Sequence, residues 1–213
     1  MVVPLAFSTA SAAFYSKEMI KIPLPSTSPS KQDGVIFVWG GSSSVGSSAI
    51  QLVRASGFEV FTTVSSHNIA YAKELGATRT FDRSSSSIVQ DIDDALKGKN
   101  LVAVYATLTQ PASMEPCRGI AKAGGLRKVI GVLPISEENK EKDGVKYDLA
   151  MAPTTQKAEY GPTVYEFLEK ALEKGSFLCR PKPKVVGKGL GDVQKALDEL
   201  KEGVSATKIV VTM

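Results

Sequence analysis

Short apolar runs alternate with helical patterns through the middle of the chain. The apolar runs predict buried strands over residues 35–38, 59–64, 78–81, 101–105 and 127–133. Apolar residues recurring three and four positions apart predict helices over 45–55, 68–75, 87–96 and 112–123. Strands and helices that alternate at this spacing predict an α/β fold, a doubly wound parallel sheet of the Rossmann type with helices on both faces.

The pattern changes at both ends of this alternating region. Residues 1–34 predict a helical arm of small residues that packs on another part of the protein, followed by a Pro- and Ser-rich connection. Residues 35–155 form the predicted nucleotide-binding domain, within which the charged stretch 135–148 predicts an exposed loop. Residues 156–213 predict a C-terminal extension that packs on the sheet or completes it.

This extension has its own periodic pattern. An amphipathic helix is predicted over 162–174, with its apolar side chains facing inward. A strand over 182–186, a capped helix over 189–203 and a strand over 206–213 follow, so the chain is predicted to end in a strand-helix-strand unit.

The first predicted strand runs into a turn made almost entirely of small residues. In a dinucleotide fingerprint three glycines allow a tight turn, approach of a pyrophosphate and close helix packing. Gly41 and Gly46 fit the outer positions, and Ser43 stands at the middle one. Ser42 and Ser44 add hydroxyl groups beside it. The residues leave two interpretations open, a phosphate-binding turn or an ordinary serine-rich connection between a strand and a helix.

The end of the second predicted strand favours NADP over NAD. An NAD site usually carries an acid there to bind the ribose, but this chain has Ser65, Ser66, His67 and Asn68. Neutral donors suit the extra phosphate of NADP, which a carboxylate would repel. Arg83 follows the third strand and is a further candidate for that phosphate. The alternative is a helix N-cap with a surface histidine and arginine.

Residues 38–77, "VWGGSSSVGSSAIQLVRASGFEVFTTVSSHNIAYAKELGA", resemble the cofactor-binding half of medium-chain dehydrogenase/reductases. They are most similar to the zinc-independent fungal enoyl reductases that act in trans with polyketide synthases, and more distantly to quinone oxidoreductases. The resemblance continues through 81–84, 123–134 and 189–211, so it covers nearly the whole chain.

The resemblance implies a role for each matching position. Ser42 to Val45 would hold the pyrophosphate, and Ser65 to Asn68 the adenosine phosphate. Thr9 matches a threonine near the nicotinamide, while Val132 and Leu133 match residues that line the nicotinamide pocket.

Two positions depart from the family pattern. Arg83 stands where these enzymes often carry a tyrosine, and "VYATLTQ" lacks the aspartate often found after the fourth strand. The family also begins with a GroES-like domain, whereas this chain begins at the segment that normally follows it. The sequence therefore predicts either a truncated product or a chain that works without that domain.

The implied reaction is NADPH-dependent reduction of an activated carbon–carbon double bond, as in an enoyl thioester of fungal polyketide or other secondary metabolism. The implied partners are the acyl-thioester substrate and a polyketide synthase. Two alternatives stay open, a quinone oxidoreductase-like enzyme and a non-catalytic NADP-binding remnant. No general acid is identified, because Tyr71, Tyr105 and Tyr160 are interpreted as packing residues.

Composition narrows the remaining classes of partner and site. The net charge is only +4, and no basic cluster is interleaved with aromatic residues, which argues against nucleic acid as a partner. Cys117 and Cys179 form no CxxC motif and, with a single histidine, predict reduced cytoplasmic thiols and no metal site. No apolar run reaches the roughly 18 residues of a membrane span. The family's first domain would normally cover the arm, Val2 to Tyr15, and the final strand, Ile209 to Val211. If they are left uncovered, they form an apolar patch that favours self-association or capture by a partner.

Overall fold

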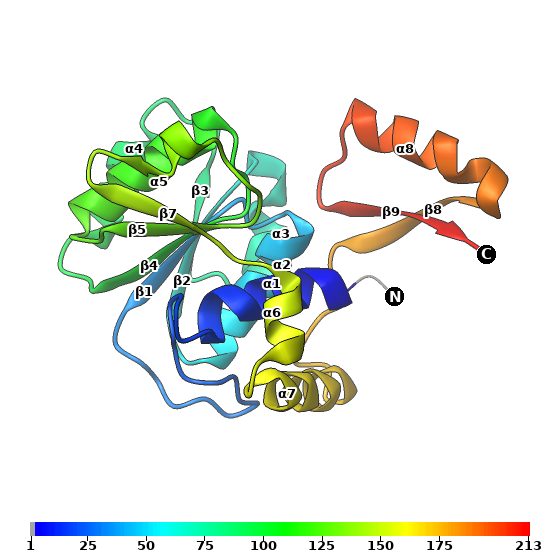
Figure 1. Ribbon diagram of the computed structural model, residues 1–213, viewed down its shortest axis with the longest axis horizontal. Helices are drawn as coiled ribbons and strands as arrows, with labels where there is room; N and C mark the ends of the chain where they lie inside the picture. The colour runs from blue at the N-terminus through cyan, green and yellow to red at the C-terminus, as the bar shows by residue number, and fades with distance from the viewer. Residues whose placement is uncertain (1–2) are drawn as a thin grey trace.

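The computed structural model describes residues 3–213, so the first two residues of the predicted arm lie outside it. Seven strands form one sheet in the order β3-β2-β1-β4-β5-β7-β6 (Figure 1). The parallel strands are β1 (Val35–Trp39), β2 (Glu59–Val64), β3 (Arg79–Asp82), β4 (Leu101–Ala106), β5 (Lys128–Gly131) and β7 (Val145–Leu149). The short β6 (Glu141–Lys142) pairs antiparallel with β7. The predicted Rossmann-type fold is confirmed.

Helices cover both faces of this sheet. One face carries α1 (Pro4–Tyr15), α2 (Ser44–Ala55) and α3 (Ile69–Glu74), and the other carries α4 (Ile88–Leu96) and α5 (Pro111–Ala123). Neighbouring residues of a strand point to opposite faces. Ile36 and Val38 of β1 accordingly join the first core, while Phe37 and Trp39 join the second. β1 is therefore buried on both faces, as expected for the centre of a parallel sheet.

The N-terminal helix α1 packs into the first core, so the expectation that the arm Val2 to Tyr15 is left uncovered is wrong for most of its described residues, of which 6–15 are buried. Phe7 and Phe14 are fully buried. Thr155 of α6 (Ala152–Lys157) donates a hydrogen bond to the Ser8 carbonyl, 2.7 Å away, and Ser8 Oγ lies 2.6 Å from the Tyr165 hydroxyl of α7 (Gly161–Glu173). Alanine and serine side chains let these helices approach one another closely.

The prediction of an exposed loop over 135–148 is wrong in its second half. After the 3₁₀ turn η2 (Glu137–Asn139), the chain forms β6 and then β7, which lies beside β5. Val145 is fully buried and Tyr147 nearly so, while Lys146 between them is exposed. This alternation of apolar and polar residues is the pattern of a strand with one buried face. The fifth strand is also shorter than predicted, because it ends at Gly131 rather than Leu133.

The C-terminal extension divides into two parts. Helix α7 packs its predicted inner face, including Val164, Phe167 and Ala171, against the first core. Beyond it, β8 (Lys182–Lys188) and β9 (Thr207–Thr212) pair only with each other, and η3 (Leu190–Asp192) and α8 (Val193–Glu202) connect them. This strand-helix-strand unit stands apart from the main sheet (Figure 1).

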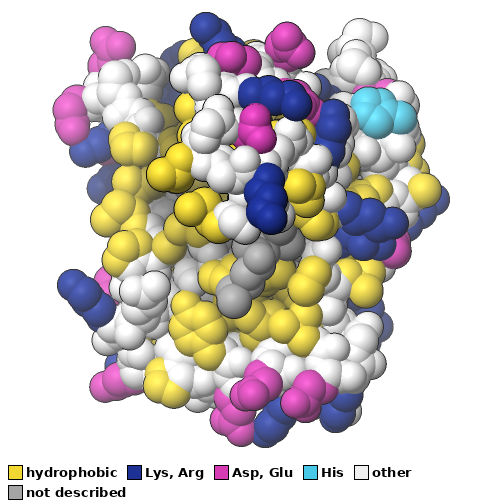
Figure 2. Space-filling model, turned by 90° about the vertical axis from the view of Figure 1, so that its right-hand side faces the viewer, with side chains coloured by type: hydrophobic (Ala, Val, Ile, Leu, Met, Phe, Trp, Pro, Cys, Tyr) yellow, Lys and Arg dark blue, Asp and Glu magenta, His cyan; other side chains and the backbone are white. Residues whose placement is uncertain are grey.

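The unit keeps an apolar surface uncovered. None of the residues of α8 is buried, although Leu197 and Leu200 recur at helical spacing and are each about half exposed. Leu190 and Val185 are exposed as well. Figure 2 views the molecule from this side and shows hydrophobic side chains gathered across it. These four side chains are therefore left largely uncovered by residues 3–213.

Candidate functional site

The serine-rich turn lies at the carboxyl end of β1, where ligands bind in sheets of this type. Ser43 is the N-cap of α2: its hydroxyl oxygen accepts a hydrogen bond from the Gly46 N–H at 2.9 Å and donates to Thr107 Oγ1 at 2.9 Å. The N–H groups of Ser44 and Val45 are the first of the helix and have no intrahelical acceptor. The turn thus directs backbone donors and the positive end of a helix dipole toward this edge.

The glycines of the turn leave no room for side chains. A Cβ atom on Gly46 would lie 2.2 Å from the Gly40 carbonyl oxygen, and one on Gly41 would lie 2.3 Å from Thr62 Oγ1. The backbone of Gly40 has a φ of +86°, in the region that favours glycine. The left-handed turn is therefore made at Gly40, one residue before the glycine that the fingerprint assigned to it.

A cavity of about 220 Å³ opens beside this turn. It brings together five of the predicted site residues, which come from three separate loops. Its wall also includes residues that the sequence analysis did not single out. Among residues 3–213, no carboxylate side chain lines it. The lining residues are Gly40, Ser42, Ser43, Thr63, Val64, Ser65, His67, Arg83, Leu108, Val204, Ser205 and Ala206.

Ser205, in the loop between α8 and β9, joins the C-terminal unit to this cavity. Its hydroxyl lies 2.8 Å from His67 Nε2 and accepts a hydrogen bond from Asn68 Nδ2, also at 2.8 Å. Ser65 precedes these residues at the end of β2, and Ser66 is exposed in the 3₁₀ turn η1 (Ser66–Asn68). The sequence analysis missed Ser205, although it lies in the C-terminal block that carries the family resemblance.

Arg83 reaches the same cavity from the end of β3. Its backbone N–H donates to the Val64 carbonyl at 2.9 Å, which ties the β3 end to the β2 end. The side chain is exposed and forms no salt bridge with any described residue. The guanidinium is therefore available to an anion in the cavity.

Nine of the fourteen predicted site residues do not line this cavity, and three of the nine belong to neither the serine-rich turn nor the segment after β2. Thr9 is buried in α1, and its hydroxyl donates to the Leu5 carbonyl at 2.8 Å. Val132 packs against the first core, and Leu133 is 56 % exposed just after β5. Val132 and Leu133 nevertheless follow a parallel strand, so they lie at the same carboxyl edge of the sheet as the serine-rich turn.

Tyr147 holds the segment after β5 in place. Its hydroxyl donates to the Leu133 carbonyl at 2.5 Å, and burial raises the pKa of Tyr147 from 10.0 to about 12. We expect Tyr147→Phe to lower the free energy of unfolding by about 0.5–1.5 kcal/mol at neutral pH. We also expect faster amide hydrogen exchange at Val132 and Leu133. Tyr165→Phe, which loses a hydrogen bond on α7 instead, should leave that exchange unchanged.

The same residue gives a pH test. Because the folded state holds the Tyr147 proton more tightly than the unfolded state, this contribution to stability is complete below pH 10 and is lost between pH 10 and about 12. Denaturant titrations from pH 9 upward should therefore show a smaller alkaline loss for Tyr147→Phe than for the parent. An equal loss in both would contradict the burial of this hydroxyl.

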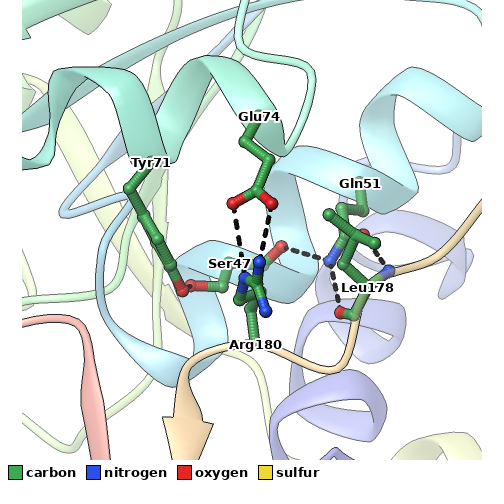
Figure 3. Close-up of polar contacts among 6 residues, drawn as sticks. All are labelled: Ser47, Gln51, Tyr71, Glu74, Leu178 and Arg180. Carbon is green, nitrogen blue, oxygen red and sulfur yellow. Dashed lines mark hydrogen bonds and ion pairs between the residues drawn. The ribbon is translucent and has the colours of Figure 1, made fainter.

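The other tyrosines considered as acids serve structural roles. Burial raises the pKa values of Tyr71, Tyr105 and Tyr160, which opposes proton release near neutral pH. Tyr105 is fully buried in the core. Figure 3 shows Tyr71 pointing from α3 to Ser47 of α2, 2.7 Å away. Since Ser47 gives its own proton to the Ser43 carbonyl at 2.8 Å, Tyr71 is the donor in this pair.

A second set of contacts in Figure 3 anchors the segment that leads to β8. Gln51 of α2 bonds both the N–H and the carbonyl of Leu178, at 2.6 and 3.1 Å. Arg180 donates to both carboxylate oxygens of Glu74, at 2.6 and 3.4 Å. These contacts fix the segment that leads to the C-terminal unit against α2 and α3.

No residues in the described part of the chain fit a metal site. Among residues 3–213, no three His, Cys, Asp or Glu side chains gather in one place. Cys117 is buried and Cys179 is exposed, and both are free thiols. As for membranes, none of the helices within residues 3–213 combines the length and apolar character needed to cross one.

Comparison with known proteins gives consistent matches. The sequence model described as "Zinc-binding dehydrogenase" matches residues 44–175. The curated protein "Dehydrogenase azaJ" of Aspergillus niger is 39 % identical over 100 % of this chain and 62 % of its own length. "Trans-enoyl reductase himH" of Aspergillus japonicus is 35 % identical over 99 % of this chain and 60 % of its own length. The chain thus spans less than two thirds of these relatives.

Solved structures show the same fold. The CurK enoyl reductase superposes with a TM-score of 0.74 at 18 % identity and covers 100 % of this chain and 61 % of its own. The quinone oxidoreductase of Pseudomonas syringae gives a TM-score of 0.72 at 21 % identity and covers 97 % of this chain and 62 % of its own.

Proposed function

The chain belongs to the zinc-binding dehydrogenase family, and from that premise we propose that it reduces an activated carbon–carbon double bond with NADPH, as in an enoyl thioester of fungal secondary metabolism. Residues 35–155 would form the NADPH-binding domain, preceded by the arm 1–34 and followed by the extension 156–213. The observation that carries the proposal is the cavity that joins the serine-rich turn to Ser65, His67 and Arg83 without a carboxylate.

The shape of the turn supports a dinucleotide. Gly41 and Gly46 lie too close to Thr62 and to the Gly40 backbone to carry a Cβ, which is the tight packing of strand, turn and helix that the dinucleotide fingerprint requires. Ser42 to Val45 provide N–H and hydroxyl donors at the start of α2, where the helix dipole favours negative charge. These residues fit the pyrophosphate of a nicotinamide dinucleotide.

The lining of the cavity supports the choice of NADPH. Phosphate at the adenosine ribose carries negative charge, which the Arg83 guanidinium attracts and a carboxylate would repel. Ser65 to Asn68 add neutral donors at the end of β2. Ser205 bridges His67 and Asn68, so the C-terminal unit borders the same subsite.

The reacting end would lie further along the same edge of the sheet. A bound nicotinamide cofactor supplies hydride chemistry. Val132 and Leu133 would line its ring, with Tyr147 fixing the Leu133 carbonyl, and Thr9 would approach the ring from α1. None of Tyr71, Tyr105 and Tyr160 is placed as the proton donor, so water or a partner surface would deliver the proton to the α-carbon.

The relatives support an enoyl thioester as substrate. Trans-enoyl reductases of two fungi, himH of Aspergillus japonicus and tndF of Aspergillus flavipes, match 99 and 100 % of this chain. A polyketide synthase would present the acyl chain. Purified chain, supplemented with the part of azaJ that it does not match, should oxidise NADPH faster with a short enoyl thioester than with a quinone; the reverse order would favour the quinone oxidoreductase alternative.

Arg83→Ala tests the cofactor assignment. Removing one charged hydrogen-bond donor to a phosphate should weaken NADPH binding by about 1.5–3 kcal/mol. NADH lacks that phosphate, so its affinity should not change. Calorimetric titration of both cofactors measures the difference directly.

Arg79→Ala is the matched control, because Arg79 is an exposed arginine of the same strand that does not line the cavity. It should leave both affinities unchanged. Equal affinity of the parent chain for NADPH and NADH would refute the assignment of NADPH.

A further inference from the structure

A second cavity opens at the carboxyl edge of the sheet, on the side of α5. Its volume is about 240 Å³. Thr109 and Pro111 border it after β4, and Pro134, Ile135 and Ser136 border it after β5. Since Leu108 lines the first cavity and Thr109 the second, the two are neighbours along the same loop.

The wall of this second cavity includes a buried arginine whose hydrogen bonds are incomplete. Arg118 of α5 is only 4 % exposed, so nearly all of its side chain is removed from water. One Nη2 proton goes to the Asn139 carbonyl oxygen, while Nε–H has no acceptor within residues 3–213. A buried donor without a partner is costly and uncommon in folded proteins.

The charge of Arg118 is also poorly balanced. The carboxylate of Glu115 lies 3.8 Å from Nη1 and is half exposed. That carboxylate is already paired with Lys142 at 2.6 Å. Arg118 and Lys142 therefore share a single negative charge, and the group keeps a net charge of +1.

The neighbouring acidic side chains are occupied elsewhere. Glu137 pairs with Lys140 at 2.6 Å, and Glu138 accepts a hydrogen bond from Ser136 at 3.2 Å. The Thr109 hydroxyl, in contrast, has no hydrogen-bond partner among the residues that the structure describes, and it borders the cavity. The cavity thus combines an underpaired cation with a free hydroxyl.

We propose that this cavity binds a small carboxylate with a short apolar chain, whose oxygen accepts from Arg118 and from Thr109. Met114, Ile135 and the two prolines provide an apolar wall beside the guanidinium. The planar guanidinium matches a carboxylate well, and the bound anion supplies the missing negative charge. The volume lies below that of typical sites for larger ligands, which restricts the occupant to a small molecule.

Butyrate is the probe, and nuclear magnetic resonance of ¹⁵N-arginine-labelled chain is the readout. Butyrate should shift the guanidinium N–H resonances of Arg118 in a saturable way without any cofactor present. Butyramide, which has the same chain without the charge, should not. Because the titration needs no NADPH, its failure is independent of failure of the proposed reductase function.

Two variants complete the test. Glu115→Gln removes the competing carboxylate and frees Lys142, and it should tighten butyrate binding about two- to fivefold. Glu141→Gln, an exposed acid on β6 outside the cavity, should leave the affinity unchanged. Arg118→Lys should abolish binding, and the Glu115 result stands even if that variant fails to fold.

Each other outcome overturns the proposal. No saturable shift with butyrate would show that the cavity is not a carboxylate site. A shift with inorganic phosphate and none with butyrate would assign it to a different anion. If Glu115→Gln and Glu141→Gln strengthened butyrate binding equally, the effect would come from the overall charge of the protein and not from a site at Arg118.

Discussion

Gly46→Val is expected to destabilise the chain and to abolish NADPH binding. Gly46 lies in the first turn of α2, where that helix crosses the serine-rich turn. Even a single Cβ there would lie 2.2 Å from the Gly40 carbonyl oxygen and 2.8 Å from Gly41 Cα. Both are backbone atoms, so no side chain can rotate away to relieve the clash. Overpacking typically costs about 1–3 kcal/mol and sometimes more.

The same displacement would disturb the proposed pyrophosphate site. The Gly46 N–H donates to Ser43 Oγ, so moving α2 breaks the N-cap and redirects the N–H groups of Ser44 and Val45. Urea unfolding measures the loss of stability, and calorimetric titration with NADPH measures the loss of binding.

Gly119→Ala is the matched control, because Gly119 is also a helical glycine but has no atom within 4 Å of an added Cβ. That variant should gain about 0.5–1 kcal/mol in stability, since alanine is the better helix former. A Gly46→Val chain that unfolds and binds NADPH like the parent would mean that the fingerprint is misplaced.

Local patterns were enough to predict the centre of the fold. β1 and β4 are continuous apolar runs, which is the usual appearance of strands buried on both faces. The helices between them begin and end close to the predicted bounds because glycines such as Gly57 and Gly76 stop them in a left-handed conformation.

Long-range pairing explains what the sequence analysis missed. β7 contains only two buried apolar side chains, Val145 and Tyr147, within a charged segment, and its place beside β5 depends on pairing that no local pattern encodes. Ser205 meets His67 across 138 positions of sequence, so spacing alone could not place it in the site. Spacing also could not single out Arg118, which donates to the carbonyl of Asn139 in the η2 turn, 21 positions further along the chain.

Purified chain 1–213 is expected to bind NADPH weakly and to show little or no enoyl reductase turnover alone. The family resemblance implies that the cofactor lies in a cleft between two domains, and the chain spans 62 % of the curated dehydrogenase azaJ. Here the proposed NADPH site is a cavity of only about 220 Å³ at the edge of one sheet. Hydride transfer requires both reactants in a near-attack geometry with water excluded. A domain that covers only one side of the cofactor does not provide this.

The uncovered C-terminal unit indicates where a second domain would dock. Leu190, Leu197 and Leu200 expose an apolar surface on the same strand-helix-strand unit whose Ser205 borders the NADPH cavity. A domain seated on that surface would bury these leucines and would also close the cavity from one side. Without it, the surface favours self-association, which light scattering of the purified chain would detect.

The decisive experiment adds the part of azaJ that this chain does not match, supplied as a separate polypeptide, to the purified chain. With NADPH and a short enoyl thioester, turnover should rise at least tenfold over the chain alone, which is about 1.4 kcal/mol of transition-state stabilisation.

Leu197→Glu should prevent this rescue, because a charge on the apolar surface opposes docking. Lys195→Glu, on the same helix, should allow it. Leu197 is half exposed, so its substitution leaves the fold intact and isolates the docking step. Robust turnover by the unmixed chain would refute the need for a second domain and would mean that residues 1–213 already hold a complete catalytic site.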